Sequence, residues 1–574
     1  MTLNHILRNY SSQPRFMGCP KRRMTSNANE FLSGSHPSKR RFGSPRMRPL
    51  TTKNDEITLN QAESKLCKLL HQCSLHLKSS AHPDLDSLTL RIAGGWVRDK
   101  LLGVESNDLD IAISSLTGQD FAIRFSTYLQ EQQQQQSPGK QADQQAQEEE
   151  EQFELGKIAT IEARPDQSKH LETATSTFLG LDLDFVQLRS EEYGDQDSRI
   201  PSNVGLADLE AGVVRTPLPA EHTFKDDPLR LLRCIRFATR FGFQLDPDII
   251  CAAKSEPIRV ALKEKISRER VGTEVDKMLK GRDPLSSLKM IEELGLYQLV
   301  FSPPVNLPAD TSLDSSVAIR AAEWLDRLLH RSDINTQDGP KSFTDYRNIS
   351  QLFPRSIALS RRLFFACALL PYRFIKCKSG KKDVWAGELV LMDSLKLGHH
   401  DKNFISRIFQ SLEILNVGNL ESILSTTTSS SVRVELGRLL RLANVHDLKQ
   451  AERETSVNWH SSLVFALVIE LSNLHSDPHQ LSFTDQELAI VKSYDQLVEI
   501  IFQMDLPFVV TPEFEKRRLD GKEICQVLGT KPGRHLGEII ERVVDRQIEH
   551  PEQTKEEGAK WLEEQLHAGL IKLS

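Results

Sequence analysis

The feature that most constrains the fold is a pair of aspartates inside an apolar run, DLDIAIS at residues 108–114. Asp108 and Asp110 flank Leu109, and successive side chains of a β-strand point to opposite faces. Both carboxylates are therefore predicted to point the same way. Two like charges so close together are unfavourable unless a cation compensates them, and Mg²⁺ prefers oxygen ligands. The segment thus predicts a strand that carries a Mg²⁺ site.

A glycine turn precedes this strand. The run LTLRIAGG, residues 88–95, is typical of a short apolar strand that ends at Gly94 and Gly95, and a helix is expected to follow. Glycines let backbone amides approach a triphosphate closely, and Arg98 offers a fork of donors for phosphate oxygens. With the aspartates, this arrangement predicts nucleotidyl transfer, in which a 3′-hydroxyl attacks an α-phosphate and pyrophosphate leaves.

A third carboxylate is available in LDLDFVQLR, residues 181–189. Asp182 and Asp184 alternate with apolar residues, so they are expected to share one face of another strand. Asp184 is the candidate for the third catalytic carboxylate. The alternative is an edge strand whose acids form salt bridges with neighbouring residues. IATIEA, residues 158–163, is a further expected strand of the same sheet.

The segment DDPLRLLR, residues 226–233, predicts a helix that begins near Pro228 with Asp227 as its cap. Arg230 and Arg233 lie three positions apart, so they are neighbours on the helix surface. A carboxylate beside a guanidinium presents both acceptors and donors, as the Watson–Crick edge of a base does. The segment therefore predicts a group that reads a nucleobase; the alternative is a helix cap followed by a solvated basic face.

The composition of the chain, with 574 residues, 39% hydrophobic and 26% charged, indicates several globular domains. The first part predicts a mixed α/β domain, in which the low-complexity residues 130–152 form a solvated loop. From about residue 222 the pattern is mainly helical. The clearest expected helices are residues 357–370, 432–443, 462–473 and 536–550.

The eight cysteines are scattered without a C-x-x-C pair, which indicates reduced, buried thiols. No apolar run reaches the roughly 18 residues of a membrane span, so no membrane partner is expected. The net charge of −6 is not that of a typical nucleic-acid binder, but Glu30 is the only acid among the first 50 residues. This basic segment is similar to a mitochondrial transit peptide, and its clusters at 20–23 and 38–41 also fit nuclear signals. Mitochondrial and cytoplasmic or nuclear localisation is predicted.

Four strings together resemble the class II CCA-adding enzymes, tRNA nucleotidyltransferases of the polymerase β superfamily. They are GGWVRD with DLD, DLEAGVVRTPL, TFKDDPLRLLRCIRFATRFGF and SRERVGTEV. Residues 519–562 resemble the eukaryotic, especially fungal, members, and the similarity covers about residues 57–570. It implies an α/β nucleotidyltransferase head with a mixed sheet, followed by α-helical domains. The implied division is a targeting segment 1–55, head 56–215, neck 216–285, body 286–500 and tRNA-binding tail 501–574.

The resemblance implies template-independent addition of C, C and A to tRNA 3′ ends from CTP and ATP with Mg²⁺. Residues 206–218 would form the hinge between head and neck, and residues 267–275 would brace the neck. The motifs also assign a role to each site residue. Gly94, Gly95 and Arg98 would contact the nucleotide phosphates. Asp108 and Asp110 would bind Mg²⁺, with Asp184 as third carboxylate. Asp227 and Arg230 would pair with the incoming base, and Arg233 would help bind the nucleotide.

One element of the family is missing. Members carry an R-R-D-x-T-I-N-A-L element, which binds triphosphate and ribose, before the hinge. Here SEEYGDQDSRIPSNVG, residues 190–205, leads directly into LADLEAGVV. Adjacent arginines occur at 22–23, 40–41, 361–362 and 517–518, and none of these pairs is followed by aspartate. We therefore predict that this chain is a slow or inactive enzyme.

Other interpretations follow from the same residues. A poly(A)-adding enzyme shares the head chemistry, and a non-catalytic tRNA-binding protein would need only the helical domains. HHD at 399–401 is reminiscent of HD-type phosphohydrolases, although a surface turn is favoured. The basic, aromatic segment 360–382 fits an RNA contact, although a core helix followed by a basic loop is favoured.

Overall fold

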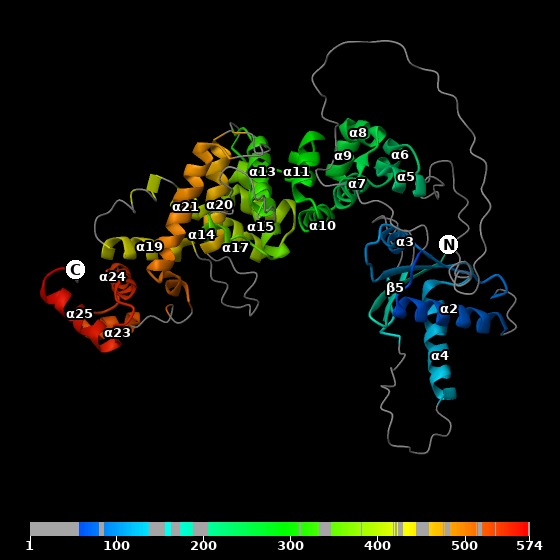
Figure 1. Cartoon of the computed structure of the whole chain (residues 1–574), viewed down its shortest axis with the longest axis horizontal. Coiled ribbons are helices and arrows are strands. Elements are labelled where there is room, and N and C mark those ends of the chain that lie inside the picture. Colours follow the sequence, from blue (N-terminus) through cyan, green and yellow to red (C-terminus); the bar gives the residue numbers. More distant parts are fainter. Residues whose placement is uncertain are drawn as a thin grey trace, which may run out of the picture. The chain divides into compact units, whose positions relative to one another are not determined.

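The computed structural model describes most of the chain in segments. These are residues 57–79, 85–136, 155–161, 173–187, 205–308, 311–331, 346–379, 382–416, 418–419, 422, 429–443, 459–474, 476, 483–511, 514, 519–533 and 535–571. They form two compact units (Figure 1). The first unit contains the described residues up to Asp227 together with Phe241–Asp246, and the second contains Pro228–Arg240 and the described residues from Pro247 onward. The targeting segment predicted at 1–55 lies outside the described residues.

The first unit is built on a five-stranded mixed sheet with the strand order β1-β2-β5-β4-β3. Strands β2 and β5 are parallel, and the other neighbouring pairs are antiparallel. This confirms the predicted mixed α/β head. The strands are β1 (Leu90–Ala93), β2 (Asp108–Ile113), β3 (Ala159–Ile161), β4 (Thr173–Phe178) and β5 (Leu181–Gln187). The helices are α2 (Gln61–Ser79), α3 (Gly94–Leu101), α4 (Gly118–Gln136), α5 (Gly205–Ala211) and α6 (Ala220–Asp226), and β6 (Val213–Val214) pairs with β7 (Gln244–Leu245).

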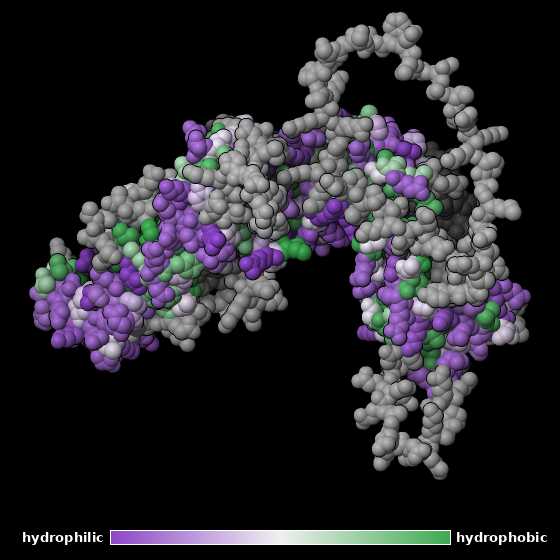
Figure 2. Space-filling model, in the orientation of Figure 1, coloured by the Kyte–Doolittle hydropathy of each residue, from purple (hydrophilic) through white to green (hydrophobic). Residues whose placement is uncertain are grey.

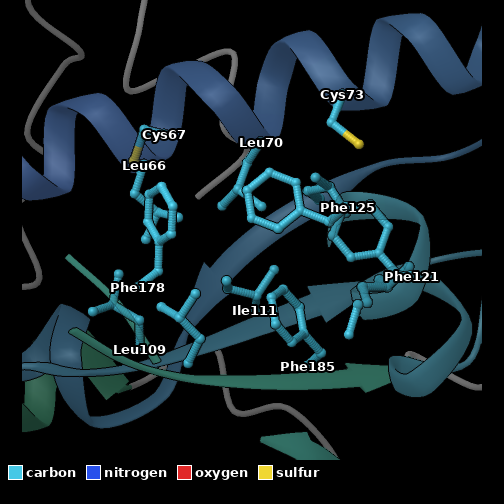
Figure 3. Close-up of a cluster of buried hydrophobic side chains, with 14 of the residues drawn as sticks. Leu66, Cys67, Leu70, Cys73, Leu109, Ile111, Phe121, Phe125, Phe178 and Phe185 are labelled. Carbon is cyan, nitrogen blue, oxygen red and sulfur yellow. The ribbon is translucent and has the colours of Figure 1, made fainter. Parts of the chain in front are cut away.

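The core of this unit lies on one face of the sheet, under helices α2 and α4 (Figure 3). Alternate residues of the strands point into it, because Leu109 and Ile111 of β2 and Phe185 of β5 are fully buried. Each such side chain contributes roughly 1.5–3 kcal/mol when it is removed from water. The polar residues between them must therefore lie on the opposite face.

The predicted loop at residues 130–152 is wrong at its beginning. Helix α4 continues to Gln136, so the first glutamines belong to the helix. Glutamine is a good helix former, and a helix already packed against the sheet extends at little cost. The following residues lie outside the described part of the chain.

The second unit is mainly helical, and the four helices expected within it are confirmed. Its N-terminal elements are α7 (Leu229–Phe241), which ends in the first unit, α8 (Pro247–Lys254), α9 (Glu256–Glu264), α10 (Arg268–Leu279), α11 (Pro284–Glu293) and α12 (Tyr297–Val300). The middle elements are α13 (Ser316–Arg331), α14 (Arg347–Ser350), α15 (Ile357–Leu369), η4 (Leu370–Tyr372), β8 (Lys376–Ser379), β9 (Lys382–Trp385), α16 (Ala386–Leu389), η5 (Val390–Ser394) and α17 (His399–Ser411). The last are α19 (Ser429–Ala443), α20 (Trp459–Asn473), α21 (Asp485–Gln503), η6 (Leu506–Val510), α23 (Gly521–Val527), α24 (Leu536–Glu549) and α25 (Lys555–His567).

Helix α10 carries the segment predicted to brace the neck. Ser267 caps this helix by accepting a hydrogen bond from the backbone amide of Arg270. The Arg268 guanidinium donates to the backbone carbonyls of Ser394, Leu299 and Val300. One side chain thereby joins α10 to the ends of α12 and η5; the bracing role stays a prediction.

On the face drawn in Figure 2 most described residues are hydrophilic, with small separate hydrophobic patches. Among the described helices, none combines the length and apolar composition of a bilayer span. The described cysteines are all free, and all of them except Cys251 are buried, as the sequence predicts.

Candidate active site

Gly94 and Gly95, the predicted glycine turn, directly follow β1 as the first residues of α3 and are fitted closely to Asp110. Gly94 has a φ of 74°, a conformation that costs little only for glycine. A Cβ atom at Gly94 would lie 1.9 Å from Oδ2 of Asp110. The backbone amide of Gly95 donates a hydrogen bond to the Asp110 carboxylate. Part of the turn that was predicted to hold phosphate therefore binds this carboxylate.

Four carboxylates lie on the face of the sheet opposite the core. In the parallel pairing of β2 with β5, Asp108 stands beside Asp182, and Asp110 stands beside Asp184. Neighbouring strands are about 4.8 Å apart, so the two pairs form a compact acidic face, here called the aspartate face. The shared face predicted for Asp108 and Asp110, and for Asp182 and Asp184, is confirmed. The register that brings the two pairs together was not predicted.

The charges of the aspartate face oppose one another. Burial raises the pKa of Asp110, the charge of Asp108 raises it further, and the hydrogen bond from Gly95 acts in the opposite direction. Burial also raises the pKa of Asp184, followed by the charges of Asp108, Asp110 and Asp182. A bound cation would relieve this repulsion.

The donor set of the aspartate face fits a hard divalent cation, because it consists of carboxylate oxygens. Among the described residues, no group of three or more His, Cys, Asp or Glu side chains is arranged to hold a metal ion by itself. Mg²⁺ is commonly held by one or two carboxylates and completed by substrate phosphates and water. Asp108 and Asp110 provide two carboxylates of this kind.

Arg98 is placed at the edge of the turn by helix α3. Its Nε donates to Oδ1 of Asp99 at 2.8 Å, and its Nη2 lies 2.7 Å from the same oxygen. Asp99 is buried, whereas the Arg98 side chain keeps 27% of its surface exposed. The carboxylate therefore orients the guanidinium while part of it stays accessible.

A buried residue that the sequence did not single out connects α2 to the glycine-turn helix. The Glu63 carboxylate, 1% exposed, accepts from Trp96 Nε1 at 3.1 Å and from Lys100 Nζ at 2.7 Å. Glu63 also exchanges hydrogen bonds with Asn60 at the start of α2. The spacing of Asn60 and Glu63 was a visible capping signal, but nothing local indicated the contact with α3.

The residues predicted to read the base lie at the junction of α6 and α7. Asp227 follows α6 in an extended conformation and is 6% exposed. Helix α7 starts at Leu229, close to the predicted start at Pro228. Arg230 is half-buried and Arg233 is exposed, on the same side of this amphipathic helix. Asp227 is thus buried, whereas Arg230 and Arg233 keep exposed surface.

The described pair of adjacent arginines has a structural role. Arg361 donates to both oxygens of Asp401, at 2.7 and 2.9 Å, and also to Asp276, while Arg362 donates to Asp401 at 3.0 Å. Burial raises the pKa of Asp401, but the bonds and charges of the two arginines outweigh it and lower that pKa overall. This pair therefore does not replace the missing R-R-D element.

The same contacts correct the interpretation of HHD as a surface turn. His399 begins helix α17, and Asp401 is buried against the arginines. The pattern resembled a turn because its first two residues are polar, as helix starts often are.

Comparison with protein families defines the class. Residues 90–195 match the family model of the poly(A) polymerase head domain, and residues 242–306 match the model described as a probable RNA and SrmB-binding site of polymerase A. The first match includes the glycine turn and the whole aspartate face. The chain is thus a protein with a nucleotidyltransferase head of the poly(A) polymerase type.

Full-length relatives identify the family within that class. A mitochondrial CCA tRNA nucleotidyltransferase of Saccharomyces cerevisiae is 31% identical over 554 residues, which cover 88% of this chain and 92% of the relative. A tRNA nucleotidyltransferase of Schizosaccharomyces pombe is 30% identical over 545 residues, with 88% and 98% covered. The solved CCA-adding enzyme of Bacillus stearothermophilus in complex with CTP is 16% identical with a TM-score of 0.48, covering 89% of this chain and 99% of that one. The chain belongs to the CCA tRNA nucleotidyltransferase family.

Proposed function

We propose that this chain adds C, C and A to the 3′ ends of tRNA, without a template, from CTP and ATP. The observation that carries the proposal is the register of β2 and β5, which places Asp108, Asp110 and Asp184 on one face beside the glycine turn. The full-length similarity to tRNA nucleotidyltransferases supports tRNA as the acceptor.

The cation of this site is proposed to be Mg²⁺, held by Asp108 and Asp110. When bound, Mg²⁺ stabilises negative charge that develops on phosphate oxygens and favours ionisation of the attacking hydroxyl. Asp184, with its raised pKa, is the candidate to accept the proton of that hydroxyl. The 3′-oxygen then forms a bond to the α-phosphorus, the bond to the bridging oxygen breaks, and pyrophosphate leaves.

The other predicted site residues are proposed to bind the nucleotide. Gly94, Gly95 and Arg98 contact the phosphates, and the orientation of Arg98 by Asp99 supports this role. Asp227 and Arg230 pair with the incoming base, and Arg233 helps to bind the nucleotide. Because Asp227 is buried, this pairing requires Asp227 to become accessible when the nucleotide binds.

The activity of this chain is proposed to be low because the R-R-D element is missing. Residues 188–204, just before the predicted deletion point, lie outside the described part of the chain. The absence of one charge-assisted hydrogen bond costs roughly 1.5–3 kcal/mol, so the absence of several slows turnover by orders of magnitude. Sequencing transcripts across the codons for Gly205 and Leu206 would show whether the short junction is real.

The domain division, with a neck at 216–285, a body at 286–500 and a tRNA-binding tail at 501–574, is kept as part of the proposal. Mitochondrial targeting by residues 1–55 is supported by two relatives that are named mitochondrial. A second, cytoplasmic or nuclear, pool is proposed from the basic clusters alone.

The test is an incorporation assay with tRNA that lacks its 3′ CCA, labelled CTP or ATP, and Mg²⁺. We expect slow incorporation of both nucleotides, which chelation of the metal or Asp108→Asn abolishes. Incorporation of ATP alone would instead identify a poly(A)-adding enzyme. Tight tRNA binding with no incorporation, even after the missing element is restored, would identify a non-catalytic tRNA-binding protein.

A further inference from the structure

The basic end of segment 360–382 forms a β-hairpin and not the predicted loop. Helix α15 is core, as expected, but strands β8 and β9 pair antiparallel after it. Lys376 stands opposite Trp385, and Lys378 stands opposite Asp383. Residues 373–383 read RFIKCKSGKKD, with Asp383 as the only acid among several cations. Lys378 pairs with Asp383 at 2.8 Å, and the segment still carries an excess of cations in a chain whose net charge is −6.

Aromatic side chains accompany these cations. Phe374 is 67% exposed, and the Arg373 guanidinium lies 4.0 Å from its ring centroid. Lys376 Nζ lies 4.7 Å from the ring centroid of Trp385. A single exposed apolar side chain is common on protein surfaces, so the feature that sets this site apart is the exposed ring together with its neighbouring cations.

A recess opens at the base of the hairpin. Phe374 and Trp385 line it together with Ile405 and Phe409 of α17, and it is a shallow recess whose cavity volume is only about 10 Å³. Gly387 leaves space in the lining, because a Cβ atom there would lie 3.7 Å from the Phe409 ring. The charged residues of the lining are Arg373, Glu388 and, just after α17, Glu413.

We propose that the exposed Phe374 ring, at the edge of this shallow recess, stacks on an unpaired base of the RNA substrate, with the hairpin lysines on the adjacent phosphates. The proposal rests on the proposed function, because it takes tRNA as the substrate. Aromatic rings beside cations are the usual means of binding single-stranded RNA, since bases stack on rings and phosphates pair with lysines. The excess of cations on the hairpin favours a polyanion over a neutral peptide.

The first experiment measures the affinity of the full chain for labelled tRNA that lacks its 3′ CCA. Phe374→Ala is expected to raise Kd about tenfold because the ring no longer stacks on the base, whereas Phe374→Tyr keeps the ring and stays near wild type. Ile357→Ala is the matched control, because Ile357 lies on α15 of the same unit with the same 67% exposure. The melting temperature of each variant shows that the fold is kept.

The second experiment distinguishes binding of the phosphates by the lysines from stacking of the base on Phe374. Changing Lys376, Lys378 and Lys382 together to Ala is expected to reduce the slope of log Kd against log salt, by roughly 0.7 for each single-strand phosphate that is no longer neutralised by a lysine. Phe374→Ala is expected to leave that slope unchanged and to weaken a single-stranded RNA oligonucleotide more than a fully paired duplex.

The proposal is overturned if Phe374→Ala and the lysine variant bind tRNA as Ile357→Ala does while the wild type binds tRNA and incorporates CTP. In that case the proposed function stands and the hairpin has another partner. If the wild type binds no tRNA, both proposals fail together.

Discussion

At the scale of single residues, the closest fit in the candidate site is between Gly94 and Asp110. The positive φ of Gly94 and the 1.9 Å separation between a Cβ there and the carboxylate leave no room for a side chain. The hydrogen bond from Gly95 fixes the same carboxylate. The two glycines and β2 therefore fit each other closely, although the rest of α3 and a loop separate them in sequence.

The raised pKa values of the aspartate face predict a dependence of stability on pH. A carboxyl whose folded-state pKa lies above its unfolded value of 3.8 holds its proton longer in the folded protein. Stability then falls as pH rises from the unfolded-state pKa to the folded-state pKa of this carboxyl, and it stays reduced at higher pH. In the absence of divalent cations, Asp184→Asn should therefore raise the melting temperature at neutral pH by a few degrees, and the gain should vanish at low pH. Thermal unfolding in a chelating buffer at a series of pH values measures this.

Asp314 supplies a control of the opposite sign. Hydrogen bonds from Ser316 lower the pKa of Asp314, so Asp314→Asn should lower the melting temperature at neutral pH. A destabilising effect of Asp184→Asn in the absence of metal would contradict the electrostatic description of the site.

Glu63 is predicted to be the side chain that holds the glycine-turn helix in place. Glu63→Gln keeps the shape of the side chain but removes the negative charge of the carboxylate to which Lys100 and Trp96 donate. Because breaking a buried ion pair leaves one charge uncompensated, we expect the free energy of unfolding to fall by about 3 kcal/mol. Urea denaturation measures it, with the exposed Glu105→Gln as a control expected to change little. If adding Lys100→Met to Glu63→Gln does not recover part of this loss of stability, the result would argue against the ion pair of Glu63 with Lys100.

At the scale of elements, the contact of α10 with the residue that follows η5 shows how the neck segment is fixed. A Cβ at Gly272 would lie 1.7 Å from the Leu395 carbonyl oxygen, so backbone meets backbone there. Arg268 bonds the Ser394 carbonyl next to this contact. The sequence indicated a mainly helical region here, but not that one of its glycines allows this close approach.

Gly272→Ala is therefore expected to destabilise the protein by about 1–3 kcal/mol, because the backbone must move to admit a methyl group. Gly537→Ala in α24 is the matched control, since a Cβ there meets no atom within 4 Å. Alanine at this helical position should stabilise by roughly 0.5–1 kcal/mol. Chemical denaturation measures the free energy of unfolding of both variants. Equal changes for Gly272→Ala and Gly537→Ala would refute the close contact at Gly272.

The same scale shows how much the sequence could predict. The alternation of Asp108, Leu109, Asp110 and Ile111 determines the two faces of β2 because that pattern is local. The pairing of β2 with β5 is not local, since α4 and two other strands separate them along the chain, so Asp182 could not be placed beside Asp108. Glu63 escaped notice for the same reason, because its partners lie in another helix.

At the scale of the whole molecule, the chain combines a specific family similarity with a missing element. Its full-length relatives cover both units, whereas the R-R-D element predicted from the family is absent from the sequence. Restoring the element between Gly205 and Leu206 is expected to raise the rate of CTP incorporation by at least about a hundredfold, since several hydrogen bonds to phosphate return together. Single-turnover kinetics measures the gain, and equal rates with and without the element would show that it is not needed here.

The most direct measurement of the central claim is the rate at which the full chain attaches labelled CMP to tRNA lacking its 3′ CCA, compared with the same chain carrying Asp110→Asn. If the aspartate face performs the transfer, the unaltered chain incorporates CMP slowly in Mg²⁺ and the variant incorporates none above background. Equal incorporation by the two proteins would contradict the account.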